Sequence, residues 1–294
     1  MPAKVIAVAN MKGGVGKTTT VVALAEFLAA YGVNGQRKRV AVVDLDAQAS
    51  ASISIAGNAL LTDLIENEKT IDIFLEDRVV RKLPTPTLKS IARRRASSLT
   101  AGGQPVDISL VASSPQLRFV EREMIYTLTD KGYGLHAIEG QTRAVVEPEL
   151  ELLRSTYDYI LVDCPPGISA FTEVMITASD LILAPVIPDF ISTRGLSAFC
   201  HSVEGIARGA KKVHVLINRL QNTTHHQDTV ADLKAGAEVK GASYVLLKTM
   251  IKQRASIGAA LETEPGATFE SRWGTQGSIA YRDLAQELVG RLNA

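Results

Sequence analysis

The sequence predicts an α/β fold with a doubly wound, mostly parallel sheet and helices on both faces. Short apolar runs recur along the 294 residues, and most are separated by stretches with the spacing of amphipathic helices. This alternation is typical of strand–helix–strand units, which bring parallel strands together. The runs are apolar at nearly every position, as expected when helices cover both faces of the sheet.

Each element follows from its own stretch of sequence. The strand-like runs cover residues 5–9, 40–44, 108–112, 159–163, 181–187, 213–218 and 244–247. The helical patterns cover residues 17–31, 115–128, 142–155, 192–208, 224–236 and 278–292. Segment 83–105 contains three prolines, two adjacent glycines and Arg93-Arg94-Arg95. We therefore expect a flexible surface insertion there, within a single domain of residues 1–294.

The most informative segment is the glycine-rich loop that follows the first run. It reads Lys12-Gly13-Gly14-Val15-Gly16-Lys17-Thr18-Thr19. Its glycines let successive N–H groups point at a phosphate, and the helix N-terminus behind it favours an anion. In such loops the lysine at position 17 reaches the β- and γ-phosphates, and the Thr18 hydroxyl binds Mg²⁺. The sequence thus predicts a P-loop for ATP and Mg²⁺. A plain glycine-rich turn is the alternative, but such a turn requires neither two lysines nor Thr-Thr.

Aspartates stand at the carboxyl ends of two predicted strands, where ligands bind in open α/β sheets. Asp163 ends the run 159–163, and a carboxylate there can hold the water shell of Mg²⁺. Asp44 and Asp46 lie where the second run enters a loop. The alternative for all three is that they cap turns.

A polar pair, Asn218 and Arg219, follows the run 213–218 at the same edge of the sheet. An amide can pair with the edge of adenine, and a guanidinium can stack on its face. The alternative is an asparagine that satisfies a turn.

Composition limits the classes of function. The net charge is +1 and the sequence pI is about 7.8, so affinity for nucleic acid must come from local patches. The two cysteines form neither a disulfide pattern nor a metal cluster. No run approaches the length of a membrane span, and the start lacks a signal-peptide pattern. We expect a cytoplasmic protein.

Basic residues gather in three stretches, for which solvated surface is the alternative to phosphate binding. The stretches are 78–95, then Arg208 with Lys211 and Lys212, and then Lys248, Lys252 and Arg254 with Arg272. Summed over a symmetric dimer, such patches can make a phosphate-binding surface, and its binding would be independent of sequence and strongly dependent on salt.

Four segments together resemble the ParA/MinD family, P-loop ATPases that position cargo in bacterial cells. Besides the loop, they are Val-Val-Asp-Leu-Asp-Ala-Gln-Ala-Ser at 42–50, Tyr-Ile-Leu-Val-Asp-Cys-Pro-Pro at 159–166 and Ile-Lys-Gln-Arg at 251–254. Ala47 stands where the family usually has proline. The match spans almost the whole chain, although residues 57–150 carry little motif information.

The resemblance implies roles for single residues. Lys12 matches a lysine that crosses the interface of an ATP-bound dimer and touches the partner's phosphates, as an arginine finger does. Asp46 matches the residue that orients the attacking water, and Asp44 a residue near the Thr18–Mg²⁺ shell. Asn218, Arg219 and Ile251 match nucleotide contacts. Nonspecific DNA binding is implied for Lys252, Arg254, Arg208 and Lys211, although Ser256 stands where some relatives carry another basic residue.

The implied function is that of an ATPase that forms a homodimer with ATP and coats nucleoid DNA nonspecifically. A ParB-like or cargo-adaptor protein would stimulate its slow hydrolysis, and the cargo would be a plasmid, a chromosome origin or a protein body. Because the loop begins at residue 12, we expect no sequence-specific DNA-binding domain before it.

Two alternatives stay open: a MinD-like membrane-associated ATPase, and a metabolic or redox P-loop ATPase. The pattern at 281–292 has balanced charges and no aromatic anchor after Tyr281, which disfavours a membrane-bound helix. Cys164 and Cys200 fit a shared iron–sulfur cluster poorly.

Overall fold

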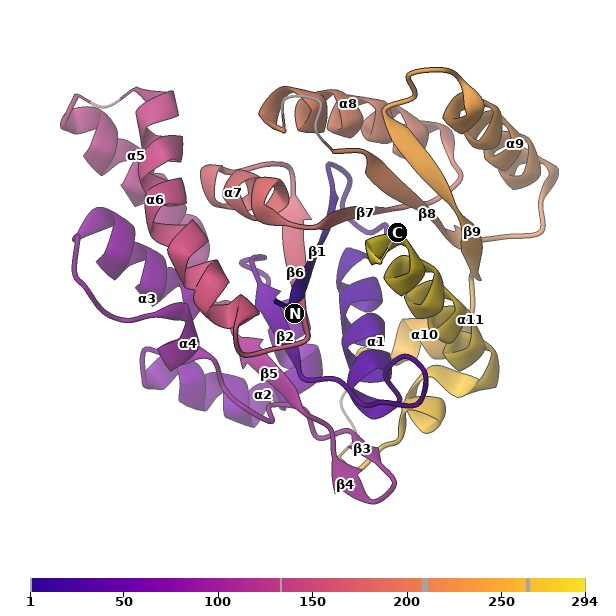
Figure 1. The fold of residues 1–294 in the computed structure, drawn as a ribbon, viewed down its shortest axis with the longest axis horizontal. Coiled ribbons are helices and arrows are strands. Elements are labelled where there is room, and N and C mark those ends of the chain that lie inside the picture. Colours follow the sequence, from indigo (N-terminus) through magenta and orange to yellow (C-terminus); the bar gives the residue numbers. More distant parts are fainter. Residues whose placement is uncertain (1, 133, 208–210, 263–264, 294) are drawn as a thin grey trace.

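A seven-stranded sheet organises the chain in the computed structural model, which describes residues 2–132, 134–207, 211–262 and 265–293. The strand order is β5-β2-β6-β1-β7-β8-β9, and each neighbouring pair is parallel (Figure 1). The strands are β1 (Lys4–Asn10), β2 (Val40–Asp44), β5 (Ile108–Val111), β6 (Tyr159–Pro166), β7 (Leu181–Val186), β8 (Val213–Leu220) and β9 (Tyr244–Lys252). Each of the apolar runs predicted as a strand belongs to this sheet, and the predicted α/β fold class is confirmed.

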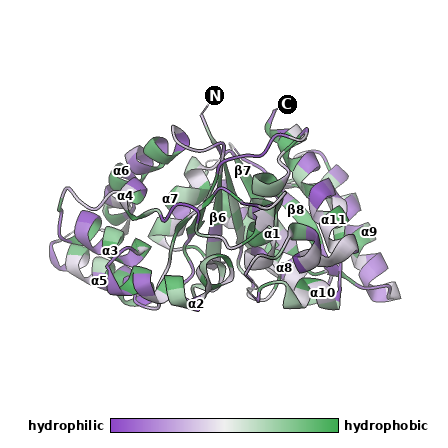
Figure 2. Ribbon diagram, turned by 90° about the horizontal axis from the view of Figure 1, so that it is seen from below, coloured by the Kyte–Doolittle hydropathy of each residue, from purple (hydrophilic) through white to green (hydrophobic). Residues whose placement is uncertain are grey.

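Helices cover both faces of the sheet. In chain order they are α1 (Lys17–Ala30), α2 (Ser50–Glu66), α3 (Ile71–Leu75), the π-helix η1 (Glu76–Val80), α4 (Leu88–Ile91), α5 (Leu117–Asp130), α6 (Leu135–Arg154), α7 (Ala170–Ala178), α8 (Phe190–Ile206), α9 (Thr224–Glu238), α10 (Ala255–Ala259) and α11 (Phe269–Leu292). Figure 2 shows these helices around the central strands, with hydrophilic and hydrophobic residues alternating along them. Such amphipathic helices bury one stripe against the sheet.

The core forms one cluster on each side of the sheet, and alternate residues of the strands feed the two clusters. In β1, Val5 and Ala7 belong to one cluster, whereas Ile6 and Val8 belong to the other. Helices α1, α2 and α11 complete the second cluster, and α3 and α5 to α8 complete the first. This packing on both faces explains why the strands lack the polar alternation of a half-exposed sheet.

A buried polar network ties three helices of one face together. The Arg272 guanidinium on α11 lies 2.6 Å from the Glu26 carboxylate on α1 and donates to the Ser54 hydroxyl on α2 at 2.7 Å. The Trp273 indole N–H donates to the other Glu26 oxygen at 2.7 Å. Only 4% of the Arg272 side chain is exposed, so its place in a DNA-binding cluster was wrongly predicted. The physical reason is that Arg272 compensates a buried carboxylate.

Several predicted boundaries differ from the structure. The helix predicted at 142–155 is α6, which begins at Leu135. The last helix begins at Phe269, well before the predicted residue 278, and its first turns escaped prediction because a kink at Gly274 (φ 68°, ψ 161°) interrupts the helical pattern. Segment 83–105 contains α4 and a short antiparallel pair, β3 (Thr100–Ala101) with β4 (Gln104–Pro105). Leu88, Ile91 and Leu99 are buried, so apolar side chains anchor this surface insertion to the domain.

Candidate active site

The glycine-rich loop joins β1 to α1 at the carboxyl edge of the sheet. Gly14 (φ 74°) and Gly16 (φ 93°) adopt left-handed conformations that favour glycine. A Cβ atom at Gly16 would lie 2.2 Å from the Asn218 amide nitrogen, which donates to the Val15 carbonyl at 2.7 Å. The end of β8 therefore holds the loop in place, and a side chain at position 16 would displace it.

Two aspartates lie side by side beneath the loop. Asp44 and Asp163 are directly opposite each other in the parallel register of β2 and β6, and both are buried. Burial raises the pKa of Asp44 to about 6, and burial together with the neighbouring Asp44 raises the pKa of Asp163 well above its usual range. Paired buried carboxyl groups are costly without a cation, so this corner of the site favours positive charge.

Thr18, Asp163 and Lys17 provide groups that fit Mg²⁺ and phosphate. The Thr18 hydroxyl donates to Asp163 Oδ2 at 2.8 Å, while Asp163 Oδ1 is buried without a hydrogen-bond partner in the described part of the chain. The Lys17 ammonium donates to the Lys12 carbonyl at 3.0 Å, and burial lowers the pKa of Lys17 although Asp163 opposes this shift. Hard oxygen donors of this kind suit Mg²⁺, and the ammonium suits a phosphate.

Within the residues that the structure describes, no group of three or more His, Cys, Asp or Glu side chains could hold a metal ion. Mg²⁺ is usually held by one or two carboxylates together with waters and substrate phosphates, so it does not require such a group. When bound with the nucleotide, the ion would neutralise charge on the phosphates and polarise them toward attack.

Asp44 also shapes the loop that carries Asp46. Its Oδ2 accepts hydrogen bonds from the Ser52 N–H at 2.9 Å and the Ser52 hydroxyl at 2.7 Å, and its Oδ1 accepts from the Asp46 N–H at 3.1 Å. Asp46 is half-buried, and its Oδ1 accepts from the Gln48 N–H at 2.9 Å.

Sequence reasoning missed Glu121, which α5 brings to the same site. The Ser169 hydroxyl, which caps α7, donates to Glu121 Oε1 at 2.6 Å. Burial raises the pKa of Glu121, and the charge of Asp46 adds to the rise. No local motif marks Glu121, because its importance arises only when the fold brings α5 beside the segment that follows Asp163.

Lys12 contacts residues of its own chain. Its ammonium lies 3.2 Å from Asp189 and donates to the Ser192 hydroxyl at 2.9 Å. Asp189 is the N-cap of α8, where it accepts from the Ser192 N–H at 2.7 Å. The two ion-paired side chains are 29% and 31% exposed, so the pair lies at the rim of the site. To reach a second chain, Lys12 has to leave this pair.

A hollow of about 470 Å³ lies beside Thr19, where the predicted base contacts gather. Asn218 and Arg219 line it, as do Lys252 and Arg254. Ile251 is only 1% exposed and packs in the core. The Asn218 oxygen accepts from the Arg219 N–H at 2.9 Å, so both ends of this amide already hold the local backbone.

The predicted DNA-binding cations divide into two groups. Lys252 and Arg254 are exposed and, together with Lys248, line a second hollow of about 390 Å³. These three cations form no ion pair within the described residues. By contrast, the Lys211 ammonium donates to the Thr177 and Ser179 carbonyls, which ties it to the end of α7. Arg208 lies outside the described residues.

A protein-family model described as an AAA domain matches residues 3–215 of this chain. The sporulation initiation inhibitor protein Soj of Bacillus subtilis is 27% identical over 292 residues, which cover 97% of this chain and 98% of Soj. The chromosome partitioning protein ParA of Caulobacter vibrioides is 25% identical, with coverage of 99% and 95%.

Solved structures share the fold. A plasmid partition protein of Borrelia burgdorferi B31 bound to AMPPNP aligns with a TM-score of 0.66 at 17% identity, covering 99% of this chain and 100% of that protein. McdA of Cyanothece aligns with a TM-score of 0.69 at 17% identity, with coverage of 97% and 99%. Cobyrinic acid a,c-diamide synthase of Mycobacterium smegmatis, with an ATP analogue and magnesium, aligns with a TM-score of 0.63 at 21% identity, with coverage of 98% and 94%.

Among the described helices, none has the length and apolar character needed to cross a bilayer.

Proposed function

Since this chain belongs to the AAA domain family and is a relative of the ParA/Soj-type partition ATPases, we propose that it binds ATP with Mg²⁺ and hydrolyses it slowly as part of a positioning cycle. In this cycle the ATP-bound chain forms a homodimer that binds DNA without sequence preference. A ParB-like or cargo-adaptor protein then stimulates hydrolysis and releases the dimer. This cycle places the protein in the cytoplasm, associated with the nucleoid.

The observation that carries the proposal is the corner formed by Thr18, Asp163 and Asp44. Asp163 Oδ1 is buried without a hydrogen-bond partner among the described residues, and Asp163 Oδ2 accepts from the Thr18 hydroxyl at 2.8 Å. Such a carboxylate suits the water shell of a phosphate-bound Mg²⁺. Lys17 enters the loop from α1 and would neutralise the phosphates. Asp46 lies at the rim of this corner and would orient the water that attacks the γ-phosphate. The glycine-rich loop would hold the phosphates of the departing ADP.

Slow hydrolysis in one chain follows from the place of Lys12. The ion pair with Asp189 holds the Lys12 charge at the rim and not over the loop. A transition state for phosphoryl transfer spreads charge over the phosphate oxygens, and a lysine supplied by a second chain would stabilise that charge. ATP turnover would then depend on formation of the dimer, so a partner protein would determine when hydrolysis occurs.

DNA binding would use the exposed cations Lys248, Lys252 and Arg254 of each chain. A symmetric dimer doubles this surface, and each phosphate contact releases counterions. Binding should therefore need ATP and fall steeply with salt.

The decisive experiment measures binding of nonspecific duplex DNA with ATP, with ADP and without nucleotide, over a series of salt concentrations. Binding with ATP alone and a steep loss with salt would support the proposal. Arg254→Gln should weaken binding and reduce the salt slope by about one unit for each phosphate that the arginine neutralises. Arg39→Gln, an exposed arginine outside the three basic stretches, serves as the control and should change neither value.

Two further variants separate the steps. Lys12→Ala should retain ATP binding but lose ATP-dependent dimerisation and DNA binding, and Asp46→Ala should give a long-lived ATP dimer. DNA binding that is absent in every nucleotide state would refute the DNA step. ATP turnover that is unchanged in Asp46→Ala would refute the role given to Asp46.

A further inference from the structure

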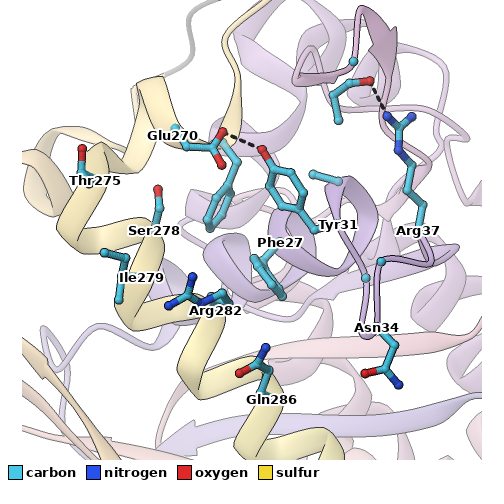
Figure 3. A pocket seen from close by; sticks show the side chains of 16 residues that line it. Phe27, Tyr31, Asn34, Arg37, Glu270, Thr275, Ser278, Ile279, Arg282 and Gln286 are labelled. Carbon is cyan, nitrogen blue, oxygen red and sulfur yellow. Dashed lines mark hydrogen bonds between the residues drawn. The ribbon is translucent and has the colours of Figure 1, made fainter.

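A second candidate site is a hollow that lies far from the glycine-rich loop, between the end of α1 and α11 (Figure 3). Its volume is about 700 Å³, which falls within the range of small-molecule sites. Helix α1 spans 14 residues and is therefore about 21 Å long, with the loop at its start and this hollow at its end. The hollow is thus separate from the nucleotide site.

Aromatic rings form one wall of the hollow. Phe27 and Tyr31 come from α1 and Phe269 from the start of α11, and their ring centroids lie 5.6 to 6.1 Å apart. The pairs are tilted or edge-to-face, the arrangement that aromatic rings prefer. Figure 3 shows Phe27 and Tyr31 on the α1 side of the hollow, with Glu270, Ser278 and Arg282 on the α11 side. Phe27 and Phe269 are only 6% and 1% exposed, so they support the Tyr31 ring, which is the ring that a flat ligand would contact.

One stripe of α11 forms the opposite wall. Thr275, Ser278, Ile279, Arg282 and Gln286 line the hollow from positions three or four apart, which places them on one helical face. Ser278 is 9% exposed, and its hydroxyl is buried without a hydrogen-bond partner among the described residues. Its hydroxyl is enclosed by the protein, so the accessible polar groups on this wall are those of Thr275, Arg282 and Gln286.

The charges that line the hollow favour an anion. Arg37 and Arg282 carry two positive charges, and Glu270 is the acidic residue that lines it. That carboxylate already accepts from the Tyr31 hydroxyl at 2.6 Å, and burial together with Glu270 raises the pKa of Tyr31 to about 12. Arg37 donates to the Ala101 carbonyl at 2.7 Å, whereas Arg282 has only an exposed contact with Asp283 at 3.2 Å. The Arg282 guanidinium therefore keeps most of its donors for a ligand.

We propose that this hollow binds a small planar aromatic acid, with the ring between Phe27, Tyr31 and Ile279 and the carboxylate on Arg282. The aromatic wall selects a flat apolar ring, and the guanidinium selects an anion by a planar, two-pronged contact. The Gln286 amide and the Thr275 hydroxyl supply the remaining polar contacts. The site is independent of the proposed ATPase cycle, since no residue of the glycine-rich loop lines it.

The test adds the probe 2-naphthoate to the full chain and measures its binding by saturation-transfer NMR and calorimetry. The neutral analogue 2-naphthalenemethanol tests the need for charge, and cyclohexanecarboxylate tests the need for a flat ring. Ile279→Trp fills the hollow from a position that is 37% exposed, so the core is left intact. Ile65→Trp is the matched control, because Ile65 is 38% exposed and lies at the end of α2.

We expect saturable binding of 2-naphthoate that Ile279→Trp abolishes and Ile65→Trp leaves unchanged. Arg282→Gln should weaken 2-naphthoate about tenfold and leave the alcohol unaffected, in keeping with the loss of a charged hydrogen bond. Mg·ADP should not compete. The proposal is overturned by a lack of saturable binding in the original chain, by equal binding to Ile279→Trp, by equal affinity for the alcohol, or by competition from ADP.

Discussion

The ion pair between Lys12 and Asp189 predicts that Asp189→Asn strengthens the ATP-dependent dimer. In the chain as described, Asp189 holds the Lys12 ammonium at 3.2 Å and caps α8 through the Ser192 N–H at 2.7 Å. Asparagine is as good an N-cap as aspartate, so the variant keeps α8 intact while it removes the charge. Lys12 then keeps only its hydrogen bond to the Ser192 hydroxyl in its own chain and would reach the second chain of the proposed dimer more easily.

The magnitude follows from exposure and symmetry. Both side chains of the pair are about 30% exposed, at 29% and 31%, and pairs of this kind contribute about 0.7 kcal/mol. A symmetric dimer has to break the pair twice, which costs about 1.4 kcal/mol in total. Because 1.4 kcal/mol corresponds to a factor of ten, the dimer dissociation constant of Asp189→Asn should fall about tenfold.

Sedimentation velocity with Mg·ATP, in the Asp46→Ala background that blocks turnover, measures this constant. Asp158→Asn is the matched control, since it removes an ion pair with Arg39 at 3.1 Å outside the active site. A second test adds Lys12→Ala, in which Asp189→Asn should have no further effect on the constant. An unchanged or weaker dimer in Asp189→Asn would refute the reasoning.

Three further outcomes are expected. Gly16→Ala should lose ATP binding and about 1–3 kcal/mol of stability in urea unfolding, because its Cβ would meet the Asn218 amide at 2.2 Å; Gly35→Ala has a similar φ of 75° but open space, and equal losses in both would contradict the clash. Glu121→Ala should lower ATP turnover about tenfold, and Glu121→Gln less than threefold, because glutamine still accepts the hydrogen bond from α7; equal turnover in the two would exclude this role. In EDTA without nucleotide, the protonated form of Asp44 stabilises the folded state, because its pKa there is about 6 against the ordinary 3.8. This stabilisation is present below pH 4 and is lost as the pH rises through 6. Unfolding should therefore need about 2 kcal/mol less at pH 7.5 than at pH 4 from this group, and a flat pH profile would contradict it.

The strands and the loop were predictable because their signals are local. A run such as 159–163 is apolar on both faces, and this pattern alone identifies a strand buried between two layers. The glycine-rich loop works through its own backbone, so its sequence specifies both its shape and its ligand. Helices α2 and α7 were missed, and α2 contains Gly57 (φ 73°, ψ 165°), which breaks its helical pattern.

The partners of charged residues were not predictable, because they depend on packing between distant segments. Arg272 and Arg254 look alike in the sequence, yet one neutralises Glu26 in the core and the other remains exposed. The Lys211 ammonium likewise donates hydrogen bonds to backbone carbonyls at the end of α7. A sequence pattern therefore overestimates the number of exposed cations, since it counts every basic residue near the carboxyl end of a strand.

If the chain binds DNA as we propose, the position of its exposed cations would couple DNA binding to the nucleotide. Lys252 and Arg254 line both the hollow beside Thr19 and the outer basic hollow, so one short segment separates the proposed base site from the proposed DNA surface. A base in the inner hollow would fix the backbone of this segment and with it the direction of the two cations. Ordering the cations beforehand lowers the entropic cost of each phosphate contact. The nucleotide would thereby raise DNA affinity within each chain, in addition to the doubling of the surface in the dimer.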